Sequence, residues 1–210
     1  MKRDEILAEA LKTLRAGGTV LYPTDTVWGL GCDATNPEAV ARIYEIKRRS
    51  EAKSLVLLAS DLDMVAKYIK EIPSIAIDLV EVNDAPMTII YPGAQYLAPN
   101  VVAEDGSVGI RIPLGEEEAG TAAPRKGAPQ GGLTAGAFCR ELVRRLRKPL
   151  VSTSANISGE PTPEGFTDIS EEIKSAVDYV VPKPFGNGAT GRSSQIIKLG
   201  LGGEVQILRP

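Results

Sequence analysis

The chain has 210 residues, of which 43% are hydrophobic and 24% charged, with a formal net charge of −3 and no histidine. This is the composition of an ordinary globular protein. The absence of histidine excludes Ser-His-Asp catalysis, Cys-His catalysis and histidine-ligated zinc. Cys32 and Cys139 stand far apart without a metal-ligand pattern, so we expect two small buried hydrophobes in a reducing compartment and no metal site. The acidic net charge argues against broad electrostatic binding to nucleic acid and leaves only a local basic patch open.

The first part of the chain predicts alternating helices and strands. Apolar residues at helical spacing predict an amphipathic helix from the amino terminus to Gly17-Gly18. Residues 19–23 predict a buried strand, and a helix is expected to begin at Asn36-Pro37. Residues 54–60 predict another strand, followed by a helix that Asp61 caps. Because the amino terminus lacks the apolar core of a signal peptide and no run reaches transmembrane length, we expect a cytoplasmic protein without a membrane contact.

The rest of the chain continues this pattern. Further strands are predicted at 86–92, 107–113, 148–154, 178–181, 194–200 and 204–210. The apolar spacing from Phe138 to Leu146 predicts a helix with an arginine-rich, solvated face. Strands interleaved with helices predict an α/β layer architecture. Residues 115–136 show neither periodicity, so we predict a flexible surface-loop insertion there and leave a role as a lid open.

Two motif matches are misleading in their context. Residues 186–193 satisfy G-x-G-x-x-G, but they precede a predicted strand, whereas a dinucleotide fingerprint leads from a strand into a helix. We therefore interpret them as a flexible turn. Asn156-Ile157-Ser158 matches the glycosylation pattern, which has no meaning in a chain without a secretion signal.

Three segments are more informative about function. Residues 23–36 leave a strand through Thr24, Asp25 and Thr26 and enter a glycine-containing turn, which suits a small polar ligand or a capped turn. Residues 46–55 place several cations at a helix end, where they either hold a triphosphate or form an exposed basic end. Residues 148–163 run from an apolar strand into a cluster of short hydrogen-bonding side chains, which suits a binding loop or a serine-rich turn.

The segments PTDTVWGLGCDA, the KRRxxxK cluster, SVGIRIP, STSANISGEPTP and the terminal ILRP together resemble the YrdC-like family of threonylcarbamoyl-AMP synthases, over nearly the whole chain. The resemblance implies an α/β fold with an open, twisted, mixed sheet, flanking helices and a concave basic cavity. It implies one domain over residues 1–210, in the short form without an extra carboxy-terminal domain.

The resemblance also implies a reaction. L-Threonine, bicarbonate and ATP with Mg²⁺ would yield threonylcarbamoyl-AMP and pyrophosphate. A separate threonylcarbamoyl transferase would then modify adenosine in tRNA. Because the reaction depends on positioning and charge neutralisation, a chain without histidine can carry it out.

The family's functional positions match ten residues of this chain. The resemblance assigns Lys47 and Arg49 to catalysis. It assigns Thr26, Arg111, Ser154 and Ser194 to threonine or its carbamate. It assigns Arg49, Lys53, Ser107, Asn156 and Arg209 to ATP. The chain departs from the family pattern at Ser54, often proline, at Leu58, where some members have histidine, and in the long 115–136 segment.

Two other functions stay open at this stage. Basic clusters at 47–53 and 140–148 are compatible with a module that binds double-stranded RNA or tRNA. A divergent paralogue with another carbamoylation or adenylylation substrate would share the fold.

Overall fold

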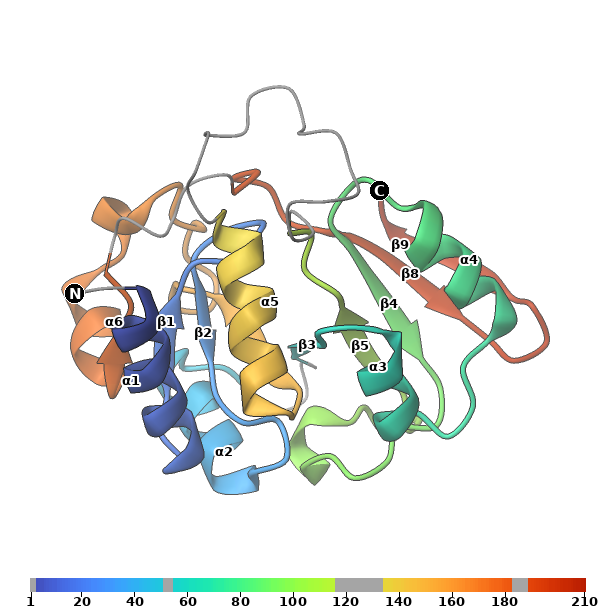
Figure 1. The fold of residues 1–210 in the computed structure, drawn as a ribbon, viewed down its shortest axis with the longest axis horizontal. Helices are drawn as coiled ribbons and strands as arrows, with labels where there is room; N and C mark the ends of the chain where they lie inside the picture. Colours follow the sequence, from blue (N-terminus) through green and yellow to red (C-terminus); the bar gives the residue numbers. More distant parts are fainter. Residues whose placement is uncertain (1–2, 51–54, 116–133, 183–188) are drawn as a thin grey trace.

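In the described part of the chain, nine strands form one mixed sheet, in the order β7-β1-β2-β6-β3-β5-β4-β8-β9 (Figure 1). The computed structural model describes residues 3–50, 55–115, 134–182 and 189–210. The strands are β1 (Val20–Tyr22), β2 (Gly29–Gly31), β3 (Val56–Leu58), β4 (Met87–Tyr91), β5 (Val108–Arg111), β6 (Leu150–Ser154), β7 (Tyr179–Val180), β8 (Gln195–Leu199) and β9 (Val205–Arg209). Three neighbouring pairs are parallel (β1 with β7, β3 with β5, β4 with β8) and the other five are antiparallel. The predicted α/β fold with an open mixed sheet is confirmed.

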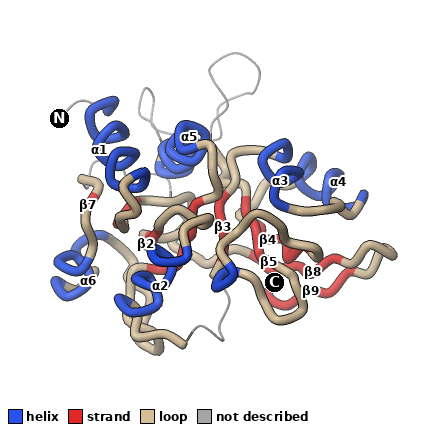
Figure 2. Tube along the Cα trace, turned by 90° about the horizontal axis from the view of Figure 1, so that it is seen from below, coloured by secondary structure: helices blue, strands red, loops and turns tan. Residues whose placement is uncertain are grey.

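Helices cover both faces of the sheet. They are α1 (Arg3–Arg15), α2 (Pro37–Ile46), α3 (Leu62–Tyr68), α4 (Ser74–Val82), α5 (Ala135–Leu146) and α6 (Glu171–Ala176), with short 3₁₀ turns η1 (Pro99–Val101) and η2 (Phe166–Asp168). Figure 2 shows α1, α5, α3 and α4 on one side of the strands and α2 and α6 on the other. The helices α1, α2 and α5 each bury an apolar stripe, as α1 does with Ile6 to Leu14, so the central strands lie between two layers of helices.

The predicted helix starts are confirmed by their caps. The Asn36 side chain accepts hydrogen bonds from the amides of Glu38 and Ala39 at 3.0 and 3.1 Å, with Pro37 in the first turn. The Asp61 carboxylate accepts from the amide of Met64 at 2.7 Å and starts α3. The helix α4 was not predicted from the sequence.

One local prediction is wrong. Gly29–Gly31, expected within a turn, form β2 between β1 and β6. These glycines admit neighbours that a side chain would exclude. A Cβ atom at Gly31 would lie 2.2 Å from the Val151 carbonyl oxygen and 2.8 Å from the Tyr22 ring. The strand therefore exists because its residues have no side chains on this face.

Both cysteines are buried and free, as predicted. Among the described helices, none combines the length and apolarity that a membrane crossing requires.

The strand β9 forms one edge of the sheet. All five of its residues are exposed, and it is hydrogen-bonded only to β8 among the described strands. The parallel partner of β8 is β4, which precedes it by more than 100 residues: Met87 pairs with Gln195. The carboxy-terminal hairpin is thus attached to the middle of the chain.

Candidate active site

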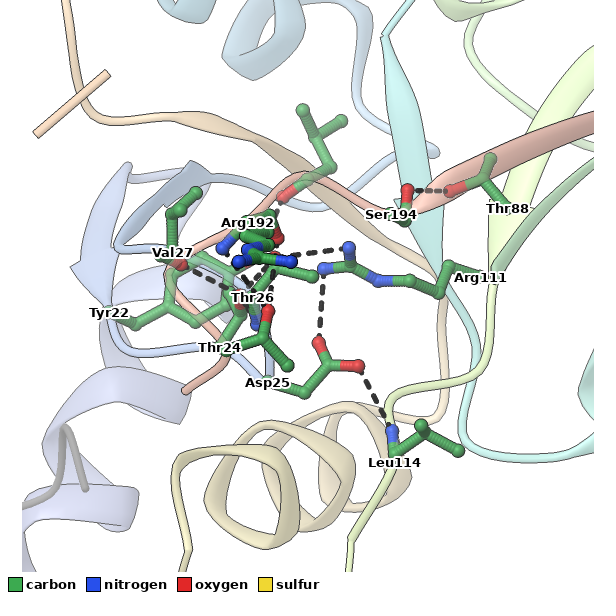
Figure 3. Close-up of polar contacts among 12 residues, drawn as sticks. Tyr22, Thr24, Asp25, Thr26, Val27, Thr88, Arg111, Leu114, Arg192 and Ser194 are labelled. Carbon is green, nitrogen blue, oxygen red and sulfur yellow. Dashed lines mark hydrogen bonds and ion pairs between the residues drawn. The ribbon is translucent and has the colours of Figure 1, made fainter. Parts of the chain in front are cut away.

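A buried arginine at the end of β5 organises the first cluster of polar side chains. Arg111 is 5% exposed, and its Nη1 donates to the Thr26 hydroxyl at 3.1 Å. Its Nη2 lies 3.2 Å from Oδ1 of Asp25. Its Nε is buried without a hydrogen-bond partner among the residues that the structure describes. Buried donors are nearly always paired, so the unpaired Nε of this guanidinium is available to a ligand. Figure 3 shows the guanidinium between Thr26 and Asp25.

The loop between β1 and β2, residues 23–28, is called the Thr26 loop below and is held in place by its own hydrogen bonds. The hydroxyl of Thr24 donates to the Val27 carbonyl at 2.7 Å and accepts from the amide of Thr26 at 3.1 Å. The hydroxyls of Thr24 and Thr26 lie 2.9 Å apart. The loop thus presents the Thr26 hydroxyl to Arg111 in a fixed position.

The carboxy-terminal segment completes this cluster. The hydroxyl of Ser194, just before β8, lies 2.8 Å from that of Thr88 on β4. Arg209 donates from Nε to the Ser194 carbonyl at 2.7 Å. Its pKa is lowered by burial and by repulsion from Arg111, so the two guanidinium groups lie near each other. Two converging cations beside the hydroxyls of Thr26 and Ser194 form a site that favours an anion.

The same segment crosses the Thr26 loop before it reaches β8. The amide of Thr190 donates to the Asp25 carbonyl and that of Gly191 to the Thr26 carbonyl, both at 2.9 Å. These bonds hold residues 190–194 against the Thr26 loop (Figure 3). We refer to Thr24, Asp25, Thr26, Thr88, Arg111, Ser194 and Arg209 as the Arg111 cluster.

A second cluster surrounds Lys47 at the end of α2. The side chain is 2% exposed, and its ammonium donates to the carbonyls of Ser154 and Asn156 at 2.6 and 2.7 Å and to the Asn156 side chain at 3.2 Å. The Ser154 hydroxyl also donates to the Asn156 side-chain oxygen, at 2.6 Å. In this structure Lys47 fixes the turn after β6. We refer to Lys47, Ser154 and Asn156 as the Lys47 cluster.

Burial, reinforced by the charge of Arg49, lowers the pKa of Lys47 from 10.5 to about 8. The unfolded chain therefore binds more protons between pH 8 and 10.5, and the contribution of Lys47 to stability rises with pH across this window. At about 1.4 kcal/mol per pKa unit, the rise is about 3 kcal/mol. We expect one lysine ¹³Cε NMR resonance to titrate near pH 8 in the wild type and to be absent in Lys47→Met. We also expect the unfolding free energy of the wild type, relative to that of Lys47→Met, to rise from pH 8 to 10.5. A Lys47 resonance that titrates with the surface lysines would contradict this prediction.

The two clusters are linked through the Thr26 loop. Ser154 pairs with Gly29, and the amide of Ala155 donates to the Trp28 carbonyl at 3.0 Å. The loop therefore ends beside the Lys47 cluster, while its Thr26 reaches the guanidinium of Arg111.

The remaining predicted residues lie as follows. Arg49 follows Lys47 and is partly buried, which lowers its pKa. Ser107 precedes β5, at the opposite end of that strand from Arg111, and its hydroxyl donates to Asp105 at 2.5 Å. Strand register places Ser107 at the same end of the sheet as Ser154, two strands or roughly 10 Å away. Lys53 lies outside the described residues, as do Ser54 and residues 116–133.

Sequence reasoning missed the roles of two residues. Thr88 was not singled out because its strand resembles any other apolar strand, yet its hydroxyl lies against Ser194. Asp25 was noted only as part of a polar loop, and its ion pair with Arg111 spans 86 positions of sequence. The signal in the sequence that could have identified Asp25 is an acidic residue between two threonines. Leu58, a departure from the family pattern, pairs with Arg111 across β3 and β5 and forms an apolar wall beside it.

A hollow of about 360 Å³ at the carboxyl end of α1 is lined by Glu9, Lys12, Arg42 and Asp178 among others. It shares no residue with either cluster, and its Arg42 and Asp178 are already ion-paired at 2.8 Å. We therefore assign the functional site to the two clusters.

The family model for Sua5, YciO and YrdC, described as "Telomere recombination", matches residues 12–116 and 132–210. The chain belongs to this YrdC/Sua5 family. Curated members of the YrdC/Sua5 family are similar over most of their length. The chain is 31% identical over 206 residues to a threonylcarbamoyl-AMP synthase of Xanthomonas euvesicatoria, covering 97% of this chain and 96% of that protein. It is 30% identical over 189 residues to the enzyme of the same name from Pseudoalteromonas translucida, covering 89% and 90%.

Solved structures of the family have the same fold. P. abyssi Sua5 complexed with L-threonine superposes with a TM-score of 0.74 at 24% identity, over 95% of this chain and 52% of that protein. E. coli YciO superposes with a TM-score of 0.71 at 19% identity, over 99% and 89%. At these identities the likeness establishes the YrdC/Sua5 fold alone.

Proposed function

We propose that the protein is a threonylcarbamoyl-AMP synthase, which condenses L-threonine, bicarbonate and ATP to threonylcarbamoyl-AMP and pyrophosphate. The observation that carries this proposal is the buried Arg111, whose Nε has no partner among the described residues, beside the hydroxyls of Thr26 and Ser194. Relatives at about 30% identity that bear this name support it.

The Arg111 cluster supplies the amino-acid subsite in this proposal. A guanidinium matches a carboxylate in shape and charge, so Arg111 binds the carboxylate of threonine. The Thr26 and Ser194 hydroxyls bind its polar groups.

The Lys47 cluster and its neighbours supply the nucleotide subsite. Lys47 holds the turn that carries Asn156, while Arg49, Lys53 and Ser107 bind ATP, which brings Mg²⁺ with it. Arg209, from the Arg111 cluster, binds ATP from the side of the amino-acid subsite. Lys47 thereby acts on catalysis by positioning Ser154 and Asn156. The catalytic role expected for Arg49 is to neutralise charge on the phosphates.

The chemistry needs positioning more than acid–base catalysis. The threonine amine first attacks the carbon of bicarbonate, whose hydroxyl leaves as water with a proton from the amine, and the resulting carbamate carries a second negative charge. A carbamate oxygen then attacks the α-phosphorus of ATP, and pyrophosphate leaves. Both reactants are anions. The barrier is therefore lowered by Arg49, Arg111 and Arg209, which hold the two anions together and offset their charge.

The test is product formation from defined substrates. The purified protein is incubated with MgATP, bicarbonate and single amino acids, and pyrophosphate and the adenylate are followed by mass spectrometry. Threonine-dependent threonylcarbamoyl-AMP is the expected result. Adenylate formation with another amino acid favours a divergent paralogue, and no product from folded, ATP-binding protein contradicts the proposed function.

Binding of double-stranded RNA or tRNA is the second candidate, and the state of the basic side chains on α5 disfavours it. Arg144 and Arg145 pair with Glu141, and Lys148 pairs with Asp33. Arg140 donates to the Ser60 carbonyl at 2.9 Å. Cations that already have acidic or carbonyl partners contribute less to phosphate binding. The downstream partner of the proposed reaction is a threonylcarbamoyl transferase, and the proposed compartment is the cytoplasm.

A further inference from the structure

Asp25 is buried beside Arg111 but takes no part in the chemistry proposed above. Its side chain is 4% exposed and that of Arg111 6%. One carboxylate oxygen, Oδ1, lies 3.2 Å from Nη2 of Arg111, and the other, Oδ2, accepts from the amide of Leu114 at 3.1 Å. The Asp25 carbonyl accepts from the amide of Thr190. One residue therefore joins the Thr26 loop, the end of β5 and the carboxy-terminal segment (Figure 3).

The two contacts explain why this residue is an aspartate. Oδ2 accepts a hydrogen bond from the amide of Leu114, whereas Oδ1 faces Arg111 in an ion pair and has no hydrogen bond among the described residues. An asparagine has only one acceptor oxygen, so its NH₂ group would face the second donor. Gly136 packs closely against the base of the Asp25 side chain, because a Cβ atom at Gly136 would lie 3.1 Å from Cβ of Asp25 and 1.8 Å from the Leu114 carbonyl oxygen.

We propose that Asp25 is a positioning residue of the amino-acid subsite: it balances the charge of Arg111 while the subsite is empty and orients the guanidinium so that Nε is left for the substrate carboxylate. This inference rests on the function proposed above. Its physical basis is that a buried unpaired guanidinium is costly and that an arginine ordered before binding loses less entropy when the ligand arrives.

Asp25 also has an opposing effect, since its negative charge repels the substrate carboxylate. Removal of the charge would then tighten threonine binding, whereas loss of orientation weakens it. The direction of the change in affinity therefore distinguishes positioning from simple charge competition.

The first experiment compares Asp25→Asn with the wild type, using threonine and threoninol, which lacks the carboxylate. We expect the threonine Kd to rise roughly 10-fold or more, because the charge-assisted contacts of the guanidinium are lost. The Kd of threoninol and the KM of ATP should change less than about 2-fold, so the preference for threonine over threoninol narrows. A tighter Kd for threonine, or an unchanged preference, overturns the proposal.

Asp33→Asn is the matched control. Asp33 is equally buried, accepts from the amide of Thr35 at 2.8 Å and pairs with Lys148 at 2.5 Å, outside both clusters. The Asp33→Asn substitution should lower thermal stability and leave the preference for threonine over threoninol unchanged. A narrowed preference in this variant would assign the effect to general destabilisation and overturn the proposal.

A second measurement needs neither substrate nor a folded variant. The ¹⁵Nε–H relaxation of arginine side chains in the wild-type protein, without ligand, reports the order of the Arg111 guanidinium. We expect Arg111 to be as rigid as the backbone before any substrate is added. A mobile guanidinium overturns the proposal, whereas failure of the synthase function appears separately, as absence of product from wild-type protein.

Discussion

Replacement of Arg111 by methionine is expected to raise the KM for threonine about 100-fold or more and the KM for ATP less than about 3-fold. A hydrogen bond to a charged group contributes about 1.5–3 kcal/mol, so loss of the bond from Nε to the substrate carboxylate accounts for a change of this size. Pyrophosphate release at varied threonine and varied ATP measures both constants. Equal increases in the two KM values would contradict the assignment of Arg111 to the substrate carboxylate.

The same variant has a second effect, on stability. Removal of the arginine leaves the Asp25 carboxylate buried without its ion pair. Breaking a buried pair in this way costs about 3–5 kcal/mol. The double variant Asp25→Asn/Arg111→Met removes both charges and should recover most of the unfolding free energy without recovering threonine binding. Arg42→Met, which breaks the exposed pair with Asp178, is the control and should leave both KM values unchanged.

Replacement of Lys47 by methionine is expected to disorder the turn after β6, because three oxygen atoms lose their common donor. We expect the KM for ATP to rise roughly 10-fold to 100-fold and the unfolding free energy to fall by about 2–3 kcal/mol, since the acceptors left behind are partly buried. Urea unfolding measures the stability, and pyrophosphate release below the unfolding transition measures the KM.

Lys12→Met provides the control for this prediction. Lys12 pairs with Glu9 at 3.8 Å on the surface of α1, away from both clusters. An exposed pair of this kind contributes little, about 0–1 kcal/mol. If Lys47→Met behaves like this control, Lys47 does not hold the turn that carries Asn156.

The sequence predicted the elements with clear local signals. Helices α2 and α3 carry a capping side chain at the residue where each begins, and the longer strands are continuous apolar runs. The short strand β2 was not predictable because glycines carry no periodic signal and its existence depends on Tyr22 and Val151 packing against it. Its pairing is a tertiary effect.

For the site, the sequence and the family resemblance indicated residues and did not indicate how they meet. The polar loop at 24–26 and the turn at 154–158 could be singled out from composition. The pairing of Asp25 with Arg111 could not, because it depends on how the Thr26 loop meets the end of β5. The three oxygens around Lys47 were equally hidden, since they include two backbone carbonyls.

The attachment of the carboxy-terminal hairpin to β4 has a consequence for synthesis of the protein. Ser194 and Arg209 reach the amino-acid subsite only after β8 has paired with β4, across more than 100 residues. Contacts of such long sequence separation form late in folding. On the ribosome, where domains fold as they emerge at about 5–20 residues per second, the subsite remains incomplete for several seconds after Arg111 has appeared. In a nascent chain, the proposed subsite therefore receives Ser194 and Arg209 only after the strands from β1 to β8 have been synthesised.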